Sequence, residues 1–124
     1  MIAVKRLAVA ALVPLSAACA GRQGDVVCTL EARSAVTVEL HDARSGAALT
    51  GPATVVARSG SYADTATVPA DMSATGLAHE RAGLYEVTVR KPGYREWTRQ
   101  DVAVTRDECH VRTVQLRAEL EPAA

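Results

Sequence analysis

Residues 82–94 (AGLYEVTVRKPGY) decide the fold class. From Tyr85 to Val89, apolar residues alternate with polar ones, which is the two-residue period of a strand with one buried face. Pro92 and Gly93 follow as a tight turn, because proline presets φ at the first central position and glycine accepts a positive φ at the second. The stretch therefore predicts a half-buried β-strand that ends in a turn.

The same alternation recurs on both sides of this stretch. Residues 36–40 and 53–58 have strand periods, and residues 97–105 return as a strand after the turn. Residues 62–76 are rich in Ala, Thr, Asp and Ser, and Pro69 interrupts any regular ladder, so we expect one short edge strand and a loop there. About seven short strands separated by turn signals predict an all-β sandwich.

Residues 109–120 are expected to form the closing strand, but their apolar pattern slips. Cys109 and Val111 occupy odd positions, whereas the later apolar residues occupy even positions. Both sets cannot face one core within a single regular strand. We therefore expect a β-bulge or a sharp bend near Arg112 and Thr113.

Residues 1–20 have the three parts of a secretory signal. Lys5 and Arg6 are its positive region, residues 7–15 (LAVAALVPL) are apolar, and residues 16–20 (SAACA) are small. The apolar run is shorter than the roughly 20 residues that span a bilayer. The predicted organisation is a cleaved signal helix at 1–20, a short tether at 21–25 and one β-sandwich domain at 26–121.

Two processing routes remain open. Ala18, Cys19 and Ala20 have the small-x-small form of ordinary cleavage, which would release a chain that starts at Gly21. Alternatively, residues 15–19 (LSAAC) resemble a lipobox, in which Cys19 is lipidated, although the large aliphatic residue lies one place further from the cysteine than usual. We expect an exported protein, either periplasmic or secreted, or anchored at the outer membrane only through a lipid on Cys19.

Composition and charge limit what the core can contain and which partners the chain can bind. The chain has no phenylalanine and one tryptophan, so its core must consist of Val, Leu and Ala. In an oxidising compartment, Cys28 and Cys109 are more useful joined than free, and a disulfide across so long a loop is worth roughly 4 kcal/mol. The 14 basic and 14 acidic residues include no basic run, which argues against a nucleic-acid partner.

Three segments resemble the carboxypeptidase regulatory-like domains: residues 38–47 (VELHDARSGA), 82–94 and 107–113 (DECHVRT). The resemblance implies a transthyretin-like (prealbumin-like) Greek-key sandwich. It also implies a disulfide from Cys109 to a cysteine near the mature N-terminus, as in small exported bacterial members. In carboxypeptidases this domain is an accessory beside the catalytic domain, so the resemblance implies no peptidase activity.

The sequence offers little catalytic chemistry. His41, His79 and His110 are its only histidines, and His79–Glu80 lacks the second histidine of a helix-borne zinc site. No Gly-x-Ser-x-Gly elbow occurs. A free Cys109 thiol beside His110 would have a lowered pKa, but a structural disulfide is the expected state. We therefore predict no catalytic residue, no cofactor and no metal ligand.

The sequence allows two positions for the Trp97 side chain, one exposed and one in the core. Counted back from Val102, it falls on the opposite face of its strand, next to Arg99. Exposed there, Trp97 and Tyr94 would offer a stacking surface for a sugar ring or a contact for a protein. Alternatively, a β-bulge near Gln100 returns Trp97 to the core.

The sequence therefore predicts a non-catalytic interaction or structural module of the cell envelope, whose partner is an envelope protein or a glycan. One alternative is a carbohydrate-binding module around Trp97 and Tyr94. Another is a small transthyretin-like hydrolase, for which histidine and arginine side chains should converge in one cleft.

Overall fold

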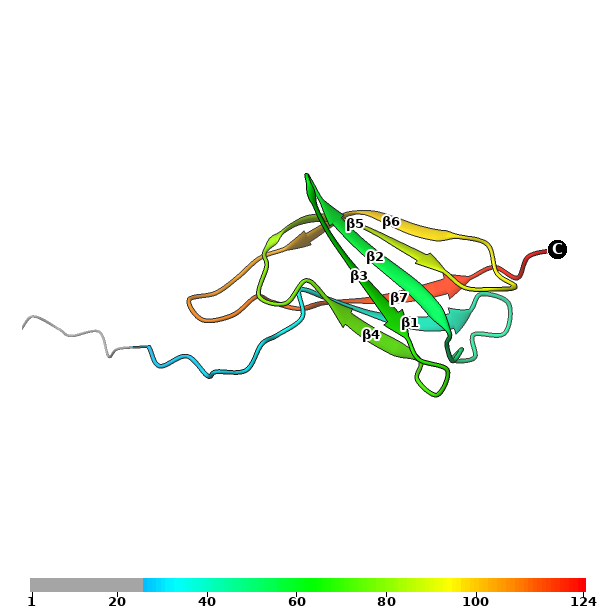
Figure 1. Ribbon diagram of the computed structural model, residues 1–124, viewed down its shortest axis with the longest axis horizontal. Coiled ribbons are helices and arrows are strands. Elements are labelled where there is room, and N and C mark those ends of the chain that lie inside the picture. Colours follow the sequence, from blue (N-terminus) through cyan, green and yellow to red (C-terminus); the bar gives the residue numbers. More distant parts are fainter. Residues whose placement is uncertain (1–25) are drawn as a thin grey trace, which may run out of the picture.

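The computed structural model describes residues 26–124 and folds them into two β-sheets packed face to face (Figure 1). The predictions for the signal, the tether and Cys19 concern residues outside this range. No helix that could cross a membrane occurs within residues 26–124. The seven strands are β1 (Val36–Asp42), β2 (Ala53–Ser59), β3 (Tyr62–Val68), β4 (Ala74–Leu77), β5 (Gly83–Arg90), β6 (Trp97–Val104) and β7 (Val114–Leu120). The predicted all-β sandwich is confirmed.

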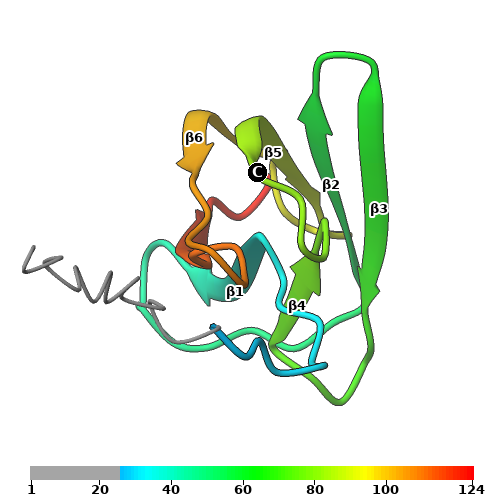
Figure 2. The same ribbon diagram turned by 90° about the vertical axis from the view of Figure 1, so that its left-hand side faces the viewer.

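The two sheets have the strand orders β4-β1-β7 and β3-β2-β5-β6. Strands β1 and β7 are parallel, in register from Val36 opposite Val114 to Asp42 opposite Leu120. All other paired strands are antiparallel. The last strand therefore lies beside the first, and the β2–β3 hairpin extends past the rest of the fold (Figure 2).

The core lies between the sheets and is built from the alternating positions of each strand. In β5, Tyr85, Val87 and Val89 are at most 1% exposed, which confirms the pattern expected for residues 82–94. Gly93 has the positive φ (85°) that the predicted turn requires. Among the described residues, Tyr85 is the largest fully buried side chain, and the other core side chains are Val, Leu and Ala.

The expectation of one short edge strand in residues 62–76 is wrong, because the structure forms both β3 and β4 there. Gly60 has a φ of +58° at the first position of a two-residue turn, the geometry of a type II′ hairpin. The turn sets β3 in register with the whole of β2, from Ser59 opposite Tyr62 to Ala53 opposite Val68. Pairing with β2 therefore overrides the weak strand propensity of this stretch.

The expected closing strand at residues 109–120 begins only at Val114, and residues 105–113 form a loop. An isolated bridge between Arg106 and Val111 closes that loop. The chain changes its pairing partner at the expected place, since the N–H of Arg112 donates to Thr105 and that of Val114 donates to Ala35, but the residues before this point form a loop and not a bulged strand. Val111 faces the core from the loop and the even positions face it from β7, while Cys109 forms the disulfide, so the mismatch needs no irregularity in β7.

Strand β6 contains the bulge that returns Trp97 to the core side. Tyr85 lies opposite Val102 and Val87 opposite Arg99, so two residues of β6 face one residue of β5. Asp101, within the bulge, has a left-handed φ of +57°. Trp97 consequently lies opposite Val89 and packs, half-buried, against the core.

Candidate functional site

Three segments meet at the end of the sandwich where the described chain begins (Figure 1). They are residues 26–35, the β4–β5 connection at 78–82 and the loop at 105–113. The disulfide between Cys28 and Cys109 joins the first segment to the third, with Cα atoms 5.1 Å apart across 81 positions of sequence. The predicted cysteine pair is therefore the covalent part of this site.

Asp107 folds the loop that carries the second cysteine. Its Oδ1 accepts hydrogen bonds from the backbone N–H groups of Cys109 (2.8 Å) and His110 (2.9 Å). Its own N–H donates to the carbonyl of His110 at 2.9 Å. The N–H donors, first that of His110, hold the pKa of the Asp107 carboxyl below its ordinary value. The ionised carboxylate therefore holds Cys109 in position for the disulfide.

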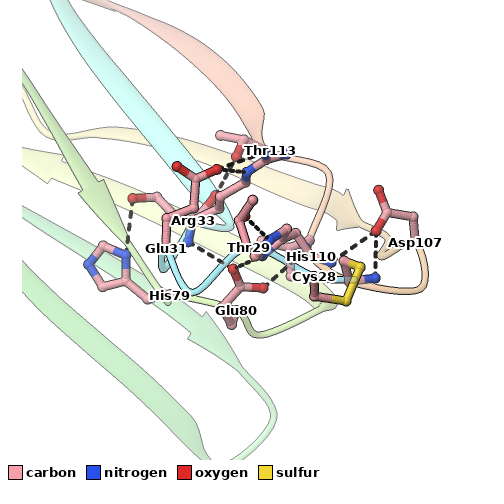
Figure 3. Close-up of polar contacts among 12 residues, drawn as sticks. Cys28, Thr29, Glu31, Arg33, His79, Glu80, Asp107, His110 and Thr113 are labelled. Carbon is pink, nitrogen blue, oxygen red and sulfur yellow. Dashed lines mark hydrogen bonds and ion pairs between the residues drawn. A yellow bond between two sulfur atoms is a disulfide. The ribbon is translucent and has the colours of Figure 1, made fainter. Parts of the chain in front are cut away.

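His110 is the buried centre of the site, with 6% of its surface exposed (Figure 3). Its Nδ1 lies 2.5 Å from Oε1 of Glu80, and its Nε2 lies 2.8 Å from Oγ1 of Thr29. Since a carboxylate only accepts, Nδ1 donates to Glu80, and whenever the ring carries a single proton Nε2 accepts from the Thr29 hydroxyl. Both ring nitrogens are thus satisfied by partners from the other two segments.

Glu80 connects all three segments. Its N–H donates to the carbonyl of Arg33 at 2.8 Å, and its Oε1 accepts from the N–H of Arg33 at 2.9 Å. Its Oε2 accepts from the N–H of Val111 at 3.2 Å. These bonds, first that of Arg33 and then that of His110, lower the pKa of Glu80. They also explain why a non-glycine residue persists here at a φ of +54°.

We call Thr29, Arg33, Glu80, Asp107 and His110 the His110 cluster. It borders an open hollow of about 530 Å³, and the lining residues are Val26, Val27, Cys28, Thr29, Arg33, Asp107, Glu108, Cys109, His110 and Arg112. One histidine and two arginines therefore converge at one hollow. His79 contacts Ser34 and His41 contacts Glu39, both outside it.

The cluster has two chemical capacities. The hydrogen-bonded order Glu80, His110, Thr29 is the carboxylate–imidazole–hydroxyl order that activates a nucleophile in acyl transfer. The same bonds also fasten residues 26–35 to two loops. Among residues 26–124, no group of three His, Cys, Asp or Glu side chains is arranged to hold a metal ion.

Tyr94 and Trp97, the two aromatic residues expected to contact a ligand, do not line the same hollow. Tyr94 donates its O–H to Oδ2 of Asp42 at 3.2 Å, and burial raises the pKa of that hydroxyl. It also lines an open hollow of about 490 Å³, together with Thr54, Arg90, Lys91, Pro92 and Glu96. Trp97 does not line that hollow and lies under the Arg99 guanidinium, 5.3 Å from its ring centroid.

Sequence reasoning missed the roles of Thr29, Glu80 and Asp107. The aspartate two positions before Cys109 is a turn signal that could have found the loop. No local signal marks Thr29, and in the sequence Glu80 stands out only as half of an incomplete zinc motif with His79. Their contacts join segments that lie 30 or more positions apart in the sequence.

Comparison with known proteins adds no family to this description. No protein-family model matches the chain, and no curated protein matches it. Fold and site together define the class: an all-β sandwich whose first described segment is fastened by a disulfide and a buried histidine cluster.

We expect the loop at 105–113 to open as the pH falls. The pKa values of Asp107 and Glu80 are both lowered in the folded chain, so their stabilising contribution is complete above the ordinary carboxyl pKa of about 4. It is lost as the pH falls through the lower, folded-state pKa values. Hydrogen exchange of this loop, corrected for intrinsic rates, should show protection decreasing between about pH 5 and pH 2.

In the Asp107→Asn variant, the amides of the loop at 105–113 should exchange faster at neutral pH. Their protection should also depend less on pH. Asp71→Asn, at an exposed turn outside the cluster, is the matched control and should behave as the unmodified chain. Equal pH dependence in the Asp107 variant and the unmodified chain would contradict the assignment.

Proposed function

We propose that this chain is a non-catalytic, exported module of the cell envelope with an interaction or structural role. Its partner is an envelope protein or a glycan, and no cofactor is required. The resemblance of residues 38–47, 82–94 and 107–113 to carboxypeptidase regulatory-like domains supports this proposal, and with it a Greek-key, transthyretin-like topology.

The observation that carries the proposal is the fastening of residues 26–35 to the end of the sandwich. A disulfide that closes a loop of 81 positions is stable in an oxidising compartment and is rare in a reducing one. The polar atoms of His110 and Glu80 are used in holding segments together. Because these polar atoms and the disulfide hold the N-terminal segment in place, they support a structural role for the module, which is attached to, or released into, the envelope.

The experiment is the intact mass of the protein purified from its native envelope, measured with and without reduction and alkylation. We expect a chain that lacks the signal and is lighter by the two hydrogens of one disulfide. A diacyl or triacyl adduct on Cys19 would identify a membrane-anchored module, whereas a chain starting at Gly21 would identify a soluble one. An intact signal or two free thiols would overturn the proposal of an exported, disulfide-fastened module.

A hydrolase is the second candidate, because His110, Arg33 and Arg112 line one hollow beside the Thr29 hydroxyl. The non-catalytic proposal expects equal, background rates of nitrophenyl ester hydrolysis for the unmodified chain and for Thr29→Ala. Thr29→Ser keeps the hydroxyl and is the matched control. Turnover that is lost in Thr29→Ala and kept in Thr29→Ser would overturn the non-catalytic proposal in favour of the hydrolase.

A further inference from the structure

Strand β3 forms an open edge of the four-stranded sheet. The strand order places β3 at one end, and among the described strands it pairs with β2 alone. In Figure 2 its outer side faces away from every other described strand. The inner side of the hairpin is held in place: Tyr62 packs edge-on against Tyr85, and the Arg81 guanidinium lies 3.9 Å from the Tyr62 ring centroid. The edge is therefore presented on a fixed strand.

The hairpin geometry determines which backbone groups this edge exposes. In a two-residue hairpin the flanking residues, here Ser59 and Tyr62, form a hydrogen-bonded pair, and such pairs alternate along the ladder. The N–H and C=O groups of Ala63, Thr65 and Thr67 therefore point away from β2. Within the described chain, none of these three residues makes a backbone hydrogen bond to a loop or turn. Each offers a free donor and a free acceptor.

The other sheet edges carry devices that discourage strand pairing. Strand β4 has only four residues, and β6 is bent by its bulge at Asp101. Strand β7 exposes the charged Arg117 and Glu119. In contrast, β3 pairs with β2 in unbroken register over seven residues and contains no proline, lysine or arginine. It is the edge with the fewest obstacles to pairing.

We propose that β3 pairs antiparallel with β3 of a second copy of this chain, about a two-fold axis at Thr65. In this register Thr65 lies opposite itself, and Ala63 lies opposite Thr67 of the second copy. These outward side chains are small and uncharged, and opposed threonines are a favourable cross-strand pair. The two four-stranded sheets would become one continuous sheet.

Charge placement favours a second copy in this register. The one charged residue of β3, Asp64, faces inward and accepts the N–H of Ala78 at 2.8 Å. About the Thr65 axis, Asp64 lies opposite Ala66 of the second copy, so the two carboxylates are not opposed. One strand pair buries less than the roughly 1,200 Å² of a standard interface, so the dimer should be weak and dependent on concentration. The inference rests on the fold and is independent of the proposed function.

The test is sedimentation equilibrium combined with hydrogen exchange of the disulfide-bonded chain. Between about 10 μM and 1 mM, we expect the dimer fraction to rise. Over the same range the amides of Ala63, Thr65 and Thr67 should become protected. Thr65→Lys should raise the dissociation constant at least about tenfold, because it places two like charges opposite each other. Thr98→Lys, on the strand at the other edge of the same sheet, is the matched control.

Thr65→Pro separates loss of pairing from loss of folding. Its missing N–H is one that points outward, so the ladder with β2 stays intact and the amides of Asp64 and Ala66 should remain protected. This variant should be monomeric and folded. A chain that stays monomeric to about 1 mM, or a dimer that tolerates both Thr65 substitutions, would overturn the proposal. So would a dimer in which the Thr65 amide exchanges freely.

Discussion

Replacing both Cys28 and Cys109 by serine should lower the free energy of unfolding by roughly 4 kcal/mol. The disulfide closes a loop of 81 positions, and opening it restores conformational freedom mainly to the unfolded chain. This loss is a large share of the roughly 5–15 kcal/mol by which domains are stable. Urea denaturation of the oxidised chain and of the double serine variant measures the difference.

Reduction of the unmodified chain is the control for this result. The reduced chain and the serine variant should have the same midpoint, since both lack only the covalent link. A loss below about 1 kcal/mol would contradict the expectation, and would show that the reduced chain keeps its loop closed, or its unfolded state compact. Hydrogen exchange at residues 105–113 would then remain slow in the variant.

Tyr85→Ala should lower the free energy of unfolding by roughly 3–5 kcal/mol, the usual cost of truncating a large buried ring. Tyr85 is 1% exposed, and its ring centroid lies 6.5 Å from that of Tyr62. Its O–H donates to the carbonyl of Arg81 at 2.7 Å. Removal of the ring therefore leaves a cavity in a core where, among residues 26–124, no other fully buried side chain is as large.

Two further variants separate the contributions of this residue. Tyr85→Phe keeps the ring and loses only the hydrogen bond, so it should cost about 1 kcal/mol. Leu84→Ala changes the neighbouring side chain, which is 57% exposed, and should stay within about 0.5 kcal/mol. Equal losses at positions 84 and 85 would contradict the assignment of Tyr85 to the core. All three are measured by the same urea titrations.

Local patterns predicted the elements whose structure is itself local. Residues 82–94 alternate with the strand period, and Pro92 and Gly93 set their own turn, so both are found as expected. Of the three cysteines, Cys19 lies in the predicted signal, and the remaining two leave one intramolecular pairing, which the structure forms. A bulge near Gln100 is one of the two alternatives that the sequence leaves open for Trp97, and the register shift in β6 agrees with it.

Elements that depend on distant contacts were not predicted. In residues 62–76 the composition predicts only one short edge strand, whereas pairing with β2 makes β3 seven residues long and pairing with β1 adds β4. Cys109 and Val111 alternate as in a strand, yet Asp107 and Glu80 hold them in a loop. The left-handed φ of Glu80 has no signature in sequence, since it results from hydrogen bonds to segments that lie far away along the chain.

The disulfide also sets the mechanical path through the molecule. A pull on the chain before Cys28 passes through the sulfur–sulfur bond to Cys109 and then along β7 to the C-terminus. Strands β1 to β6 lie within the closed loop and carry none of this load directly. Reduction would place all 81 positions in the path and allow the stretched chain to lengthen by up to roughly 270–290 Å. The oxidised molecule is thus a short, nearly inextensible link, and the reduced one is an extensible one.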